Sequence, residues 1–503
     1  METPTPKRTI KAISPRSKIP VFKAPIKLPI KLQHNTNYAQ ITYFNVPDKL
    51  QRSPSLKGLD SPSLKSLDIT RLPDDLKLIG PENWAPWSSA MMAVAELSGF
   101  DTAVLEEMPQ AVHVSCWHNS QKTMEQVREV IGHGNKQVQD AILQQYSSIE
   151  YVHTMAYTTS KAEELADALT ELSRPFGLTK AYFVCSGSEA VDAAMKLARQ
   201  YQVENGQPQR KRFVARRQAY HGNSIGAMSR DDETEEQCAA RLVQELGDEF
   251  QQAGPETVIA FVAETVGGAA AACITPPQGD FEGVRKVCDQ YGILLILEEI
   301  KCGSGRTGSY FAFEREGDVK PDLVTLGKGL GGGYAPIAGV LISEKVVQVL
   351  KGGSARFVHG HTYQAHPACC AAGLAVQQII KRDDLVAKCL SRGAPLESRL
   401  RCVLGDAKYM GEIRGRGLFL GIEFVQDRAS KQPFKPAVKF ASRMQEAAHS
   451  RGLAVYPGSG TVDGVNSDHI IVAPPLTITE EEVDEIVRLL KMVDDAVEEE
   501  LVV

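Results

Sequence analysis

The chain lacks an uninterrupted apolar run of the roughly 18 residues that a membrane-spanning helix requires. It also lacks an excess of basic residues: the formal net charge is −6 at pH 7, which gives no reason to expect nucleic acid or a membrane as a partner. Its ten cysteines lack the spacing of a disulfide framework or a metal cluster, which is typical of a reducing compartment. What is present is 503 residues with 43% hydrophobic content, enough for the cores of a large and a small domain of a soluble protein.

The first 75 residues contain little that could be buried. Residues 1–32 are rich in proline and lysine, with eight basic residues and a single acidic one, Glu2. The segment 53–60 is repeated almost unchanged at 61–68. Such a composition predicts a disordered extension. Its scarcity of acidic residues resembles a mitochondrial presequence, but the prolines would break the amphipathic helix needed for import, so we expect a cytoplasmic protein with a mitochondrial one as the alternative.

Lys328 lies between an apolar stretch and a glycine-rich loop, in the sequence VTLGKGLGGGY at 324–334. A phosphate-binding P-loop is excluded, because Asp322 and Gly329 stand where that motif needs a glycine and a serine or threonine. A lysine whose stem lies in an apolar site can lose its proton and form a Schiff base with a carbonyl. The alternative is a solvated lysine in a flexible loop.

A second apolar stretch, at 293–297, ends in the acidic pair Glu298 and Glu299. A carboxylate at the carboxyl end of a neighbouring strand could stabilise a buried pyridinium nitrogen. Together with Lys328, this pattern indicates pyridoxal phosphate (PLP), which needs a lysine for its aldehyde and an acidic partner for its ring nitrogen.

Another glycine-containing motif joins an apolar stretch to a helical pattern, in the sequence AYFVCSGSEA at 181–190. The N–H groups at the start of a helix carry partial positive charge, so Gly187 and Ser188 could bind a phosphate. The alternative is an ordinary helix that has Ser186 or Ser188 as its N-cap.

Tyr220, His221 and Gly222 form a further motif, in which an aromatic beside a turn could stack on a flat cofactor ring. In this order the motifs resemble those of the class III (omega or ornithine-type) aminotransferases, and the resemblance covers roughly residues 130–490. The matching stretches are SGSEA at 186–190, YHG at 220–222, AE at 263–264, EEIKCGSGRTG at 298–308, PDLVTLGKGLGGGY at 321–334, HGHTYQAHP at 359–367, RGRGLFLGIE at 414–423 and APPLTIT at 473–479.

The resemblance implies a PLP-dependent transferase of fold type I (aspartate-aminotransferase-like), an α/β protein. Its large domain has a mostly parallel sheet, and its smaller domain is α+β. Lys328 would form the Schiff base and move the proton at the substrate Cα, while Glu298 would face the ring nitrogen. Gly187 and Ser188 would hold the phosphate, joined by Thr362 from the other subunit of a homodimer.

The resemblance also implies the remaining site positions. Tyr220, with His221 beside it, would stack on one face of the cofactor ring, and Ile300 would pack on the other. Glu264 would lie at the substrate entrance, and Arg414 is a second candidate for contact with substrate.

The chain departs from the family's pattern in several places, of which four bear on the site. Glu298 replaces the usual Asp, which keeps the charge but adds a methylene. Lys301 replaces a common Gln or Met, so it is either a second cation near the cofactor's phenolate oxygen or a surface lysine. No arginine for a substrate carboxylate precedes the pair Pro474 and Pro475. Upstream of residue 130 the usual Tyr-Asp-x-x-Gly turn is not visible, which leaves the substrate mouth and the dimer contact open.

We therefore predict a PLP-dependent aminotransferase that moves an amino group between an amine or amino acid and an oxo acid or aldehyde. The alternatives are a decarboxylase, lyase or aminomutase of the same fold, or a catalytically silent paralogue. His359, His361 and His366 could be zinc ligands, but they lie inside one family motif, so we expect no metal. We expect four parts: a disordered extension at 1–75, the amino-terminal part of the small domain at 76–140, the large PLP-binding domain at 141–380 and the carboxyl-terminal small domain at 381–503.

Overall fold

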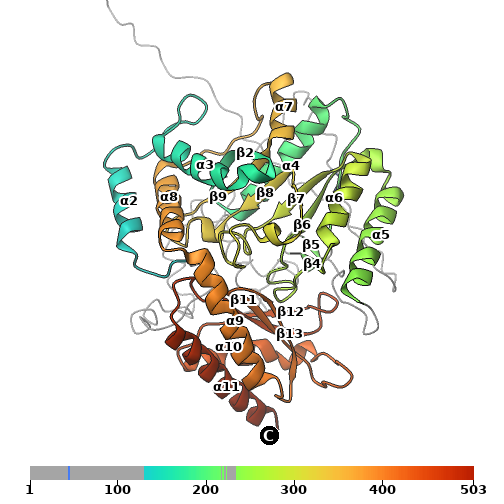
Figure 1. Cartoon of the computed structure of the whole chain (residues 1–503), viewed down its shortest axis with the longest axis vertical. Coiled ribbons are helices and arrows are strands. Elements are labelled where there is room, and N and C mark those ends of the chain that lie inside the picture. The colour runs from blue at the N-terminus through green and yellow to red at the C-terminus, as the bar shows by residue number, and fades with distance from the viewer. Residues whose placement is uncertain (1–43, 46–129, 217, 220–221, 224–233, 503) are drawn as a thin grey trace, which may run out of the picture. The chain divides into compact units, whose positions relative to one another are not determined.

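The computed structural model describes residues 44–45, 130–216, 218–219, 222–223 and 234–502. Its main element is a seven-stranded sheet in the order β1-β3-β6-β7-β8-β9-β2 (Figure 1). In that order the strands are β1 (Phe44–Asn45), β3 (Arg212–Ala215), β6 (Val258–Glu264), β7 (Leu294–Glu298), β8 (Leu323–Leu326), β9 (Ala338–Ser343) and β2 (Leu178–Val184). Strands β3, β6, β7 and β8 are parallel to one another, whereas β9 is antiparallel to both of its neighbours. The expected α/β fold with a mostly parallel sheet is confirmed.

Helices cover both faces of this sheet. They are α3 (Ser160–Ser173), α4 (Gly187–Glu204), α5 (Glu235–Ala253), α6 (Asp280–Tyr291), α7 (Glu344–Gly352) and α8 (Pro367–Arg382). Alternate residues of β7 point to opposite faces: Leu295 and Leu297 pack with α3, α5, α6 and α8, while Leu294 and Ile296 pack with α4 and α7. A strand buried on both faces must be apolar throughout, which explains the uninterrupted apolar run that the sequence showed there.

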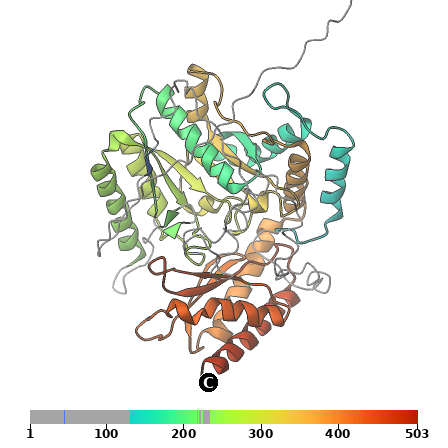
Figure 2. The same cartoon turned by 180° about the vertical axis from the view of Figure 1, so that it is seen from behind.

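The carboxyl-terminal elements form a second sheet with its own helices (orange to red in Figure 2). This sheet is antiparallel, with the order β10 (Met410–Arg416), β11 (Phe419–Phe424), β13 (Asp468–Val472) and β12 (Tyr456–Ser459). The helices are α9 (Leu385–Leu404), α10 (Phe440–Ser450) and α11 (Glu480–Val502). Val130, Ile131 and α2 (Lys136–Tyr146) contribute to the same apolar core. The division into four parts stays a prediction.

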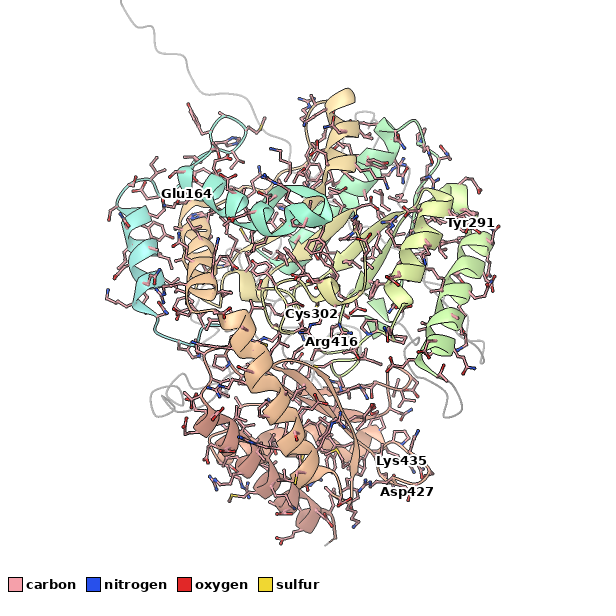
Figure 3. The ribbon with its side chains drawn as sticks, viewed as in Figure 1. Glu164, Tyr291, Cys302, Arg416, Asp427 and Lys435 are labelled. Atoms are coloured by element: carbon pink, nitrogen blue, oxygen red, sulfur yellow. The ribbon has the colours of Figure 1, made fainter. Side chains whose placement is uncertain are left out.

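The loops that follow the large sheet contact the antiparallel sheet. Cys302, after β7, packs in a small apolar cluster with Phe419 of β11 and Ile471 of β13. Arg416, at the end of β10, forms an ion pair with Glu316 (Figure 3). The segments that follow β7 therefore contact the antiparallel sheet.

Two further observations concern the described residues only. None of their helices is both long enough and apolar enough to cross a bilayer. All of the cysteines among them are free. The remaining strands are the short β4 (Gln218–Ala219) and β5 (Gly222–Asn223).

Candidate active site

The carboxyl ends of three adjacent parallel strands bring the predicted polar residues together. Glu264 at the end of β6 pairs in register with Glu298 at the end of β7, and Glu298 pairs with Thr325 of β8. Lys328 follows β8 directly after Gly327. This edge of a parallel sheet is where α/β proteins place their ligands.

Lys328 has a backbone conformation that is uncommon for a residue with a side chain. Its φ is +34°, in the left-handed region, at the start of a short turn (Lys328–Leu330). The turn is held because Leu330 donates to the Gly327 carbonyl at 2.7 Å and Gly332 donates to the Lys328 carbonyl at 2.9 Å. Backbone strain of this kind is found mainly where the surrounding structure fixes a functional side chain.

Glu298 is a buried carboxylate, with 4% of its surface exposed. Its Oε1 accepts a hydrogen bond of 2.6 Å from the backbone N–H of Ile300, so the longer side chain curls back toward its own loop. Beside it, the hydroxyl of Thr325 is buried and makes no hydrogen bond within the part of the chain that the structure describes. A buried carboxylate and a hydroxyl that lacks a partner among the described residues thus lie together at this edge.

Helix α4 begins at the predicted phosphate motif. Ser186 is its N-cap, because the Ser186 side chain accepts from Glu189 N at 3.2 Å. A Cβ on Gly187 would lie 2.8 Å from Cδ1 of Ile300, and a Cβ on Gly327 would lie 3.0 Å from Cγ2 of the same side chain. A side chain at either glycine would therefore require Ile300 to move, and Ile300 adjoins both the helix start and the backbone that precedes Lys328.

Lys301 is half-buried and lies next to Glu264. Its Nζ is 4.7 Å from the centre of the Tyr456 ring. A Cβ on Gly268 would lie 2.6 Å from Cδ of Lys301 and 3.2 Å from Oε1 of Glu264, so both side chains pass over this glycine. Burial and, to a smaller extent, the charge of Lys328 lower the pKa of Lys301 to about 8, while Glu264 opposes the shift. The sequence reasoning did not identify Gly268 or Tyr456, because only their position in space relates them to Lys301.

Arg414, the second candidate for substrate contact, is surrounded by acceptors from the protein itself. Its guanidinium donates to Glu412 and Glu423, each at 2.6 Å. It also donates to the carbonyls of Ala272 at 3.1 Å and Ala271 at 3.3 Å. These bonds use most of its five N–H donors, and its role toward substrate stays a prediction.

Thr362 lies on the surface of the single chain, in the segment that precedes α8. Its carbonyl accepts a hydrogen bond of 2.9 Å from the Tyr151 hydroxyl. Tyr220 and His221 lie outside the described residues.

The residues present fit PLP by their chemistry. The amine of Lys328 is a partner for an aldehyde, and the buried carboxylate of Glu298 is a partner for a ring nitrogen. The N-terminus of the 18-residue helix α4 is a partner for a phosphate. Ile300 adds an apolar surface between the helix start and Gly327.

Comparisons with known proteins agree with this chemistry. The family model described as "Aminotransferase class-III" matches residues 126–239 and 230–493. An uncharacterised aminotransferase of Schizosaccharomyces pombe is 41% identical over 391 residues, which cover 72% of this chain and 85% of that protein. A diaminobutyrate–2-oxoglutarate transaminase of Halomonas elongata is 33% identical over 410 residues, covering 74% and 86%. Among solved structures, the omega transaminase of Pseudomonas jessenii in complex with PMP superposes with a TM-score of 0.68 at 30% identity, covering 74% and 87%.

Proposed function

The chain belongs to the class III aminotransferases, which use PLP to transfer an amino group from a donor to an oxo acceptor, and from this premise we propose that Lys328 is the lysine to which PLP attaches. The observation that supports the assignment is the meeting of Lys328, Glu298, Ile300 and Gly187 at one edge of the sheet. No other lysine among the described residues follows a buried parallel strand with a glycine on either side.

Bound PLP supplies an aldehyde carbon and an electron-withdrawing ring. The amine of Lys328 would hold the cofactor at its aldehyde carbon and would also move the proton at the substrate Cα. The carboxylate of Glu298 holds the ring nitrogen in its protonated state. Gly187 and Ser188 present the helix N-terminus to the phosphate.

We also propose which residues lie against the two faces of the cofactor ring. Ile300 would pack against one face of the ring, since its side chain lies close to both Gly187 and Gly327. Tyr220 and His221 lie outside the described residues, and for the other face we keep the expectation from the family motif that Tyr220, with His221 beside it, would stack there.

For the substrate, we propose that Lys301 supplies the positive charge that pairs with a carboxylate on the amino donor. The chain has no arginine directly before Pro474, and Arg414 is engaged by Glu412 and Glu423. Lys301 lies with Glu264 in the same cluster as Lys328. Glu264 partners the ammonium when no substrate is present.

We further propose that the active protein is a homodimer in the cytoplasm. Exposed apolar side chains gather near Thr362 on two segments, at 149–157 and 358–363. Among them Met155 is 89% exposed, Tyr157 68% and Tyr363 60%, which is unusual for a surface left in water. A second copy on this surface would bring Thr362 to the partner's phosphate. The free cysteines support a reducing compartment.

The decisive experiment distinguishes Lys328 from its neighbour Lys301. The PLP-loaded protein is reduced with borohydride, digested and analysed by mass spectrometry. We expect the reduced cofactor on Lys328 alone in the wild type and in a Lys301→Gln control. A Lys328→Ala variant should lose the label and lose turnover by several orders of magnitude. A label on Lys301 would show that the assignment is wrong.

Product analysis then tests the reaction itself. With a reactive amino donor, the enzyme should release one keto product for each amine that appears on the acceptor. Release of carbon dioxide in place of the keto product would indicate a decarboxylase of the same fold.

A further inference from the structure

The segment that precedes α8 is laid along one face of helix α4. Glu204 accepts from the backbone N–H and the hydroxyl of Ser354, at 3.2 and 2.6 Å. One turn earlier, Gln200 donates to the Arg356 carbonyl at 2.7 Å and accepts from Val358 N at 2.9 Å. Residues four apart lie on the same face of a helix, so this contact continues toward the start of α4.

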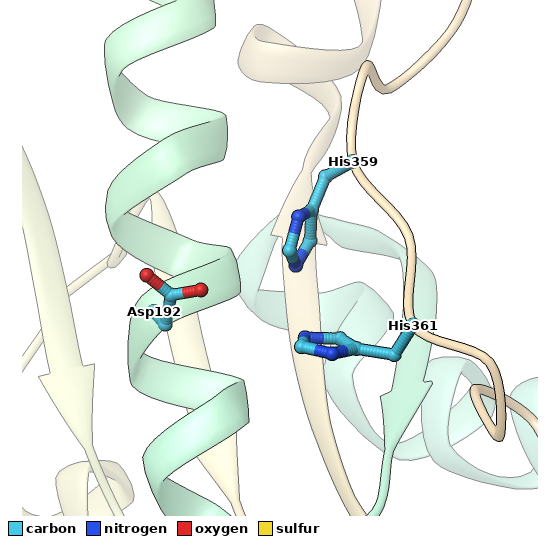
Figure 4. Close-up of side chains that lie close together, drawn as sticks. All are labelled: Asp192, His359 and His361. Atoms are coloured by element: carbon cyan, nitrogen blue, oxygen red, sulfur yellow. The ribbon is translucent and has the colours of Figure 1, made fainter. Parts of the chain in front are cut away.

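Two further turns along this face lies Asp192, opposite His359 and His361. The ligand atoms of the three side chains all lie within 4.8 Å of one another. Figure 4 shows both imidazole rings extending from the loop toward the Asp192 carboxylate on α4. The Nε2 atoms of both histidines are buried and make no hydrogen bond within the described part of the chain. Buried nitrogens of this kind need a partner, because leaving one without costs about 1–3 kcal/mol.

We propose that Asp192, His359 and His361 bind a divalent transition-metal ion of the zinc class. Two imidazoles and one carboxylate suit Zn²⁺, which takes nitrogen at about 2.0–2.1 Å and carboxylate oxygen at about 2.0–2.2 Å. Around such an ion the ligand atoms are roughly 3.5 Å apart, so small rotations of the side chains close the site. Three protein ligands leave the fourth position to water.

The loop around the histidines is already held in place. The backbone N–H of His361 donates to Oε1 of Gln364 at 2.9 Å, and the Tyr182 hydroxyl donates to the same oxygen at 2.5 Å. The rings of Tyr182 and Phe357 flank His359. Their centroids lie 6.0 Å and 5.3 Å, respectively, from the centroid of the His359 ring, and 5.2 Å from each other. A preformed loop reduces the entropy that an ion must overcome in ordering its ligands.

Lys196 is the one competitor for the carboxylate among the ion pairs of this region. Its Nζ is 2.6 Å from Oδ2 of Asp192, but both side chains are about half exposed, at 52% and 49%. Exposed pairs of this type contribute little to stability, and of the two carboxylate oxygens it is Oδ2 that makes the ammonium contact. A metal ion can therefore displace Lys196 from the Asp192 carboxylate or share that carboxylate with it.

The sequence reasoning considered only the histidines of this loop and included His366. Asp192 lies in a different element, so the third ligand could not be found from spacing. His366 has a buried nitrogen without a hydrogen bond but does not belong to the cluster, which makes it a matched control.

The test uses full-length protein without a histidine tag, treated with a chelator and then titrated with Zn²⁺ by calorimetry, with the metal content measured by mass spectrometry. We expect one high-affinity ion per chain. Asp192→Asn and His361→Gln should each weaken binding at least tenfold, whereas His366→Gln should change it less than twofold. Circular dichroism of each variant verifies folding.

A second readout does not depend on any variant. Co²⁺ added to the wild-type protein should give visible absorption bands of a four-coordinate site, and Zn²⁺ should abolish them. The proposal is overturned if the wild type binds no more Zn²⁺ than an Asp192→Asn/His361→Gln double variant, or if His366→Gln reduces binding as much as His361→Gln.

Discussion

The contact between Gly187 and Ile300 gives the sharpest prediction about the cofactor site. A methyl group on Gly187 would lie 2.8 Å from Cδ1 and 3.0 Å from Cγ2 of Ile300. Ile300 also adjoins Gly327, where an added Cβ would lie 3.0 Å from its Cγ2, so this side chain packs close to the backbone that precedes Lys328. Gly187→Ala must therefore displace the side chain that we place against the cofactor ring.

The expected cost follows from this overlap. Forcing an extra methyl group into a packed site typically costs about 1–3 kcal/mol. If the overlap destabilises the PLP-bound protein and not the apoprotein, this cost weakens PLP binding roughly 5- to 150-fold. Alanine is otherwise favoured over glycine in a helix by up to about 1 kcal/mol, so loss of affinity cannot come from the helix itself.

The assay is a double-mutant cycle. Ile300→Val removes Cδ1 and alone should cost about 0.5–1.5 kcal/mol of stability. In Gly187→Ala/Ile300→Val the worst overlap is gone, so PLP affinity should recover by about 1 kcal/mol or more relative to Gly187→Ala. Gly247→Ala is the control, because its added methyl group meets nothing within 4 Å. The dissociation constant of PLP is measured by absorbance, and the free energy of unfolding of the apoprotein by urea titration.

Two results would refute this reasoning. If Gly187→Ala binds PLP as tightly as the wild type, Ile300 is not held against the cofactor site. If the double variant binds as weakly as the single one, the overlap with Cδ1 is not the cause of the loss.

Three other predictions concern single side chains. Thr362→Ala should raise the dissociation constant of PLP by roughly 10- to 150-fold, the effect of losing one hydrogen bond to a charged group, and an unchanged constant would exclude Thr362 as a ligand. Glu298→Gln should keep PLP bound but slow the donor half-reaction on the order of 100-fold, since a neutral amide cannot keep the ring nitrogen protonated; full activity in stopped-flow measurements would remove Glu298 from the mechanism. Because the pKa of Lys301 is about 8, its positive charge is lost as pH rises through that value. The kcat/KM for a donor with a carboxylate should then fall above pH 8, and Lys301→Gln should flatten this fall while leaving a donor without a carboxylate unaffected.

Local patterns in the sequence were enough to predict the two strands that precede Glu298 and Lys328. The apolar runs before Glu298 and Lys328 form β7 and β8, because a strand buried on both faces needs apolar residues at every position. The sequence also placed the N-cap of α4 at Ser186 or Ser188, since a cap and its helix are adjacent in the chain, and the structure has it at Ser186. The two apolar runs therefore predict that Glu298 and Lys328 lie at the same edge of the sheet.

Only the tertiary structure decided which side chains meet across elements. Ile300 was expected at the cofactor from its motif, but its contact with Gly187 depends on how α4 packs against the loop after β7. The same holds for Lys301 beside Glu264, and for Asp192 opposite His361. These contacts join residues far apart in the chain, and their distances are set by the close packing of whole helices and strands, which no local spacing of residues encodes.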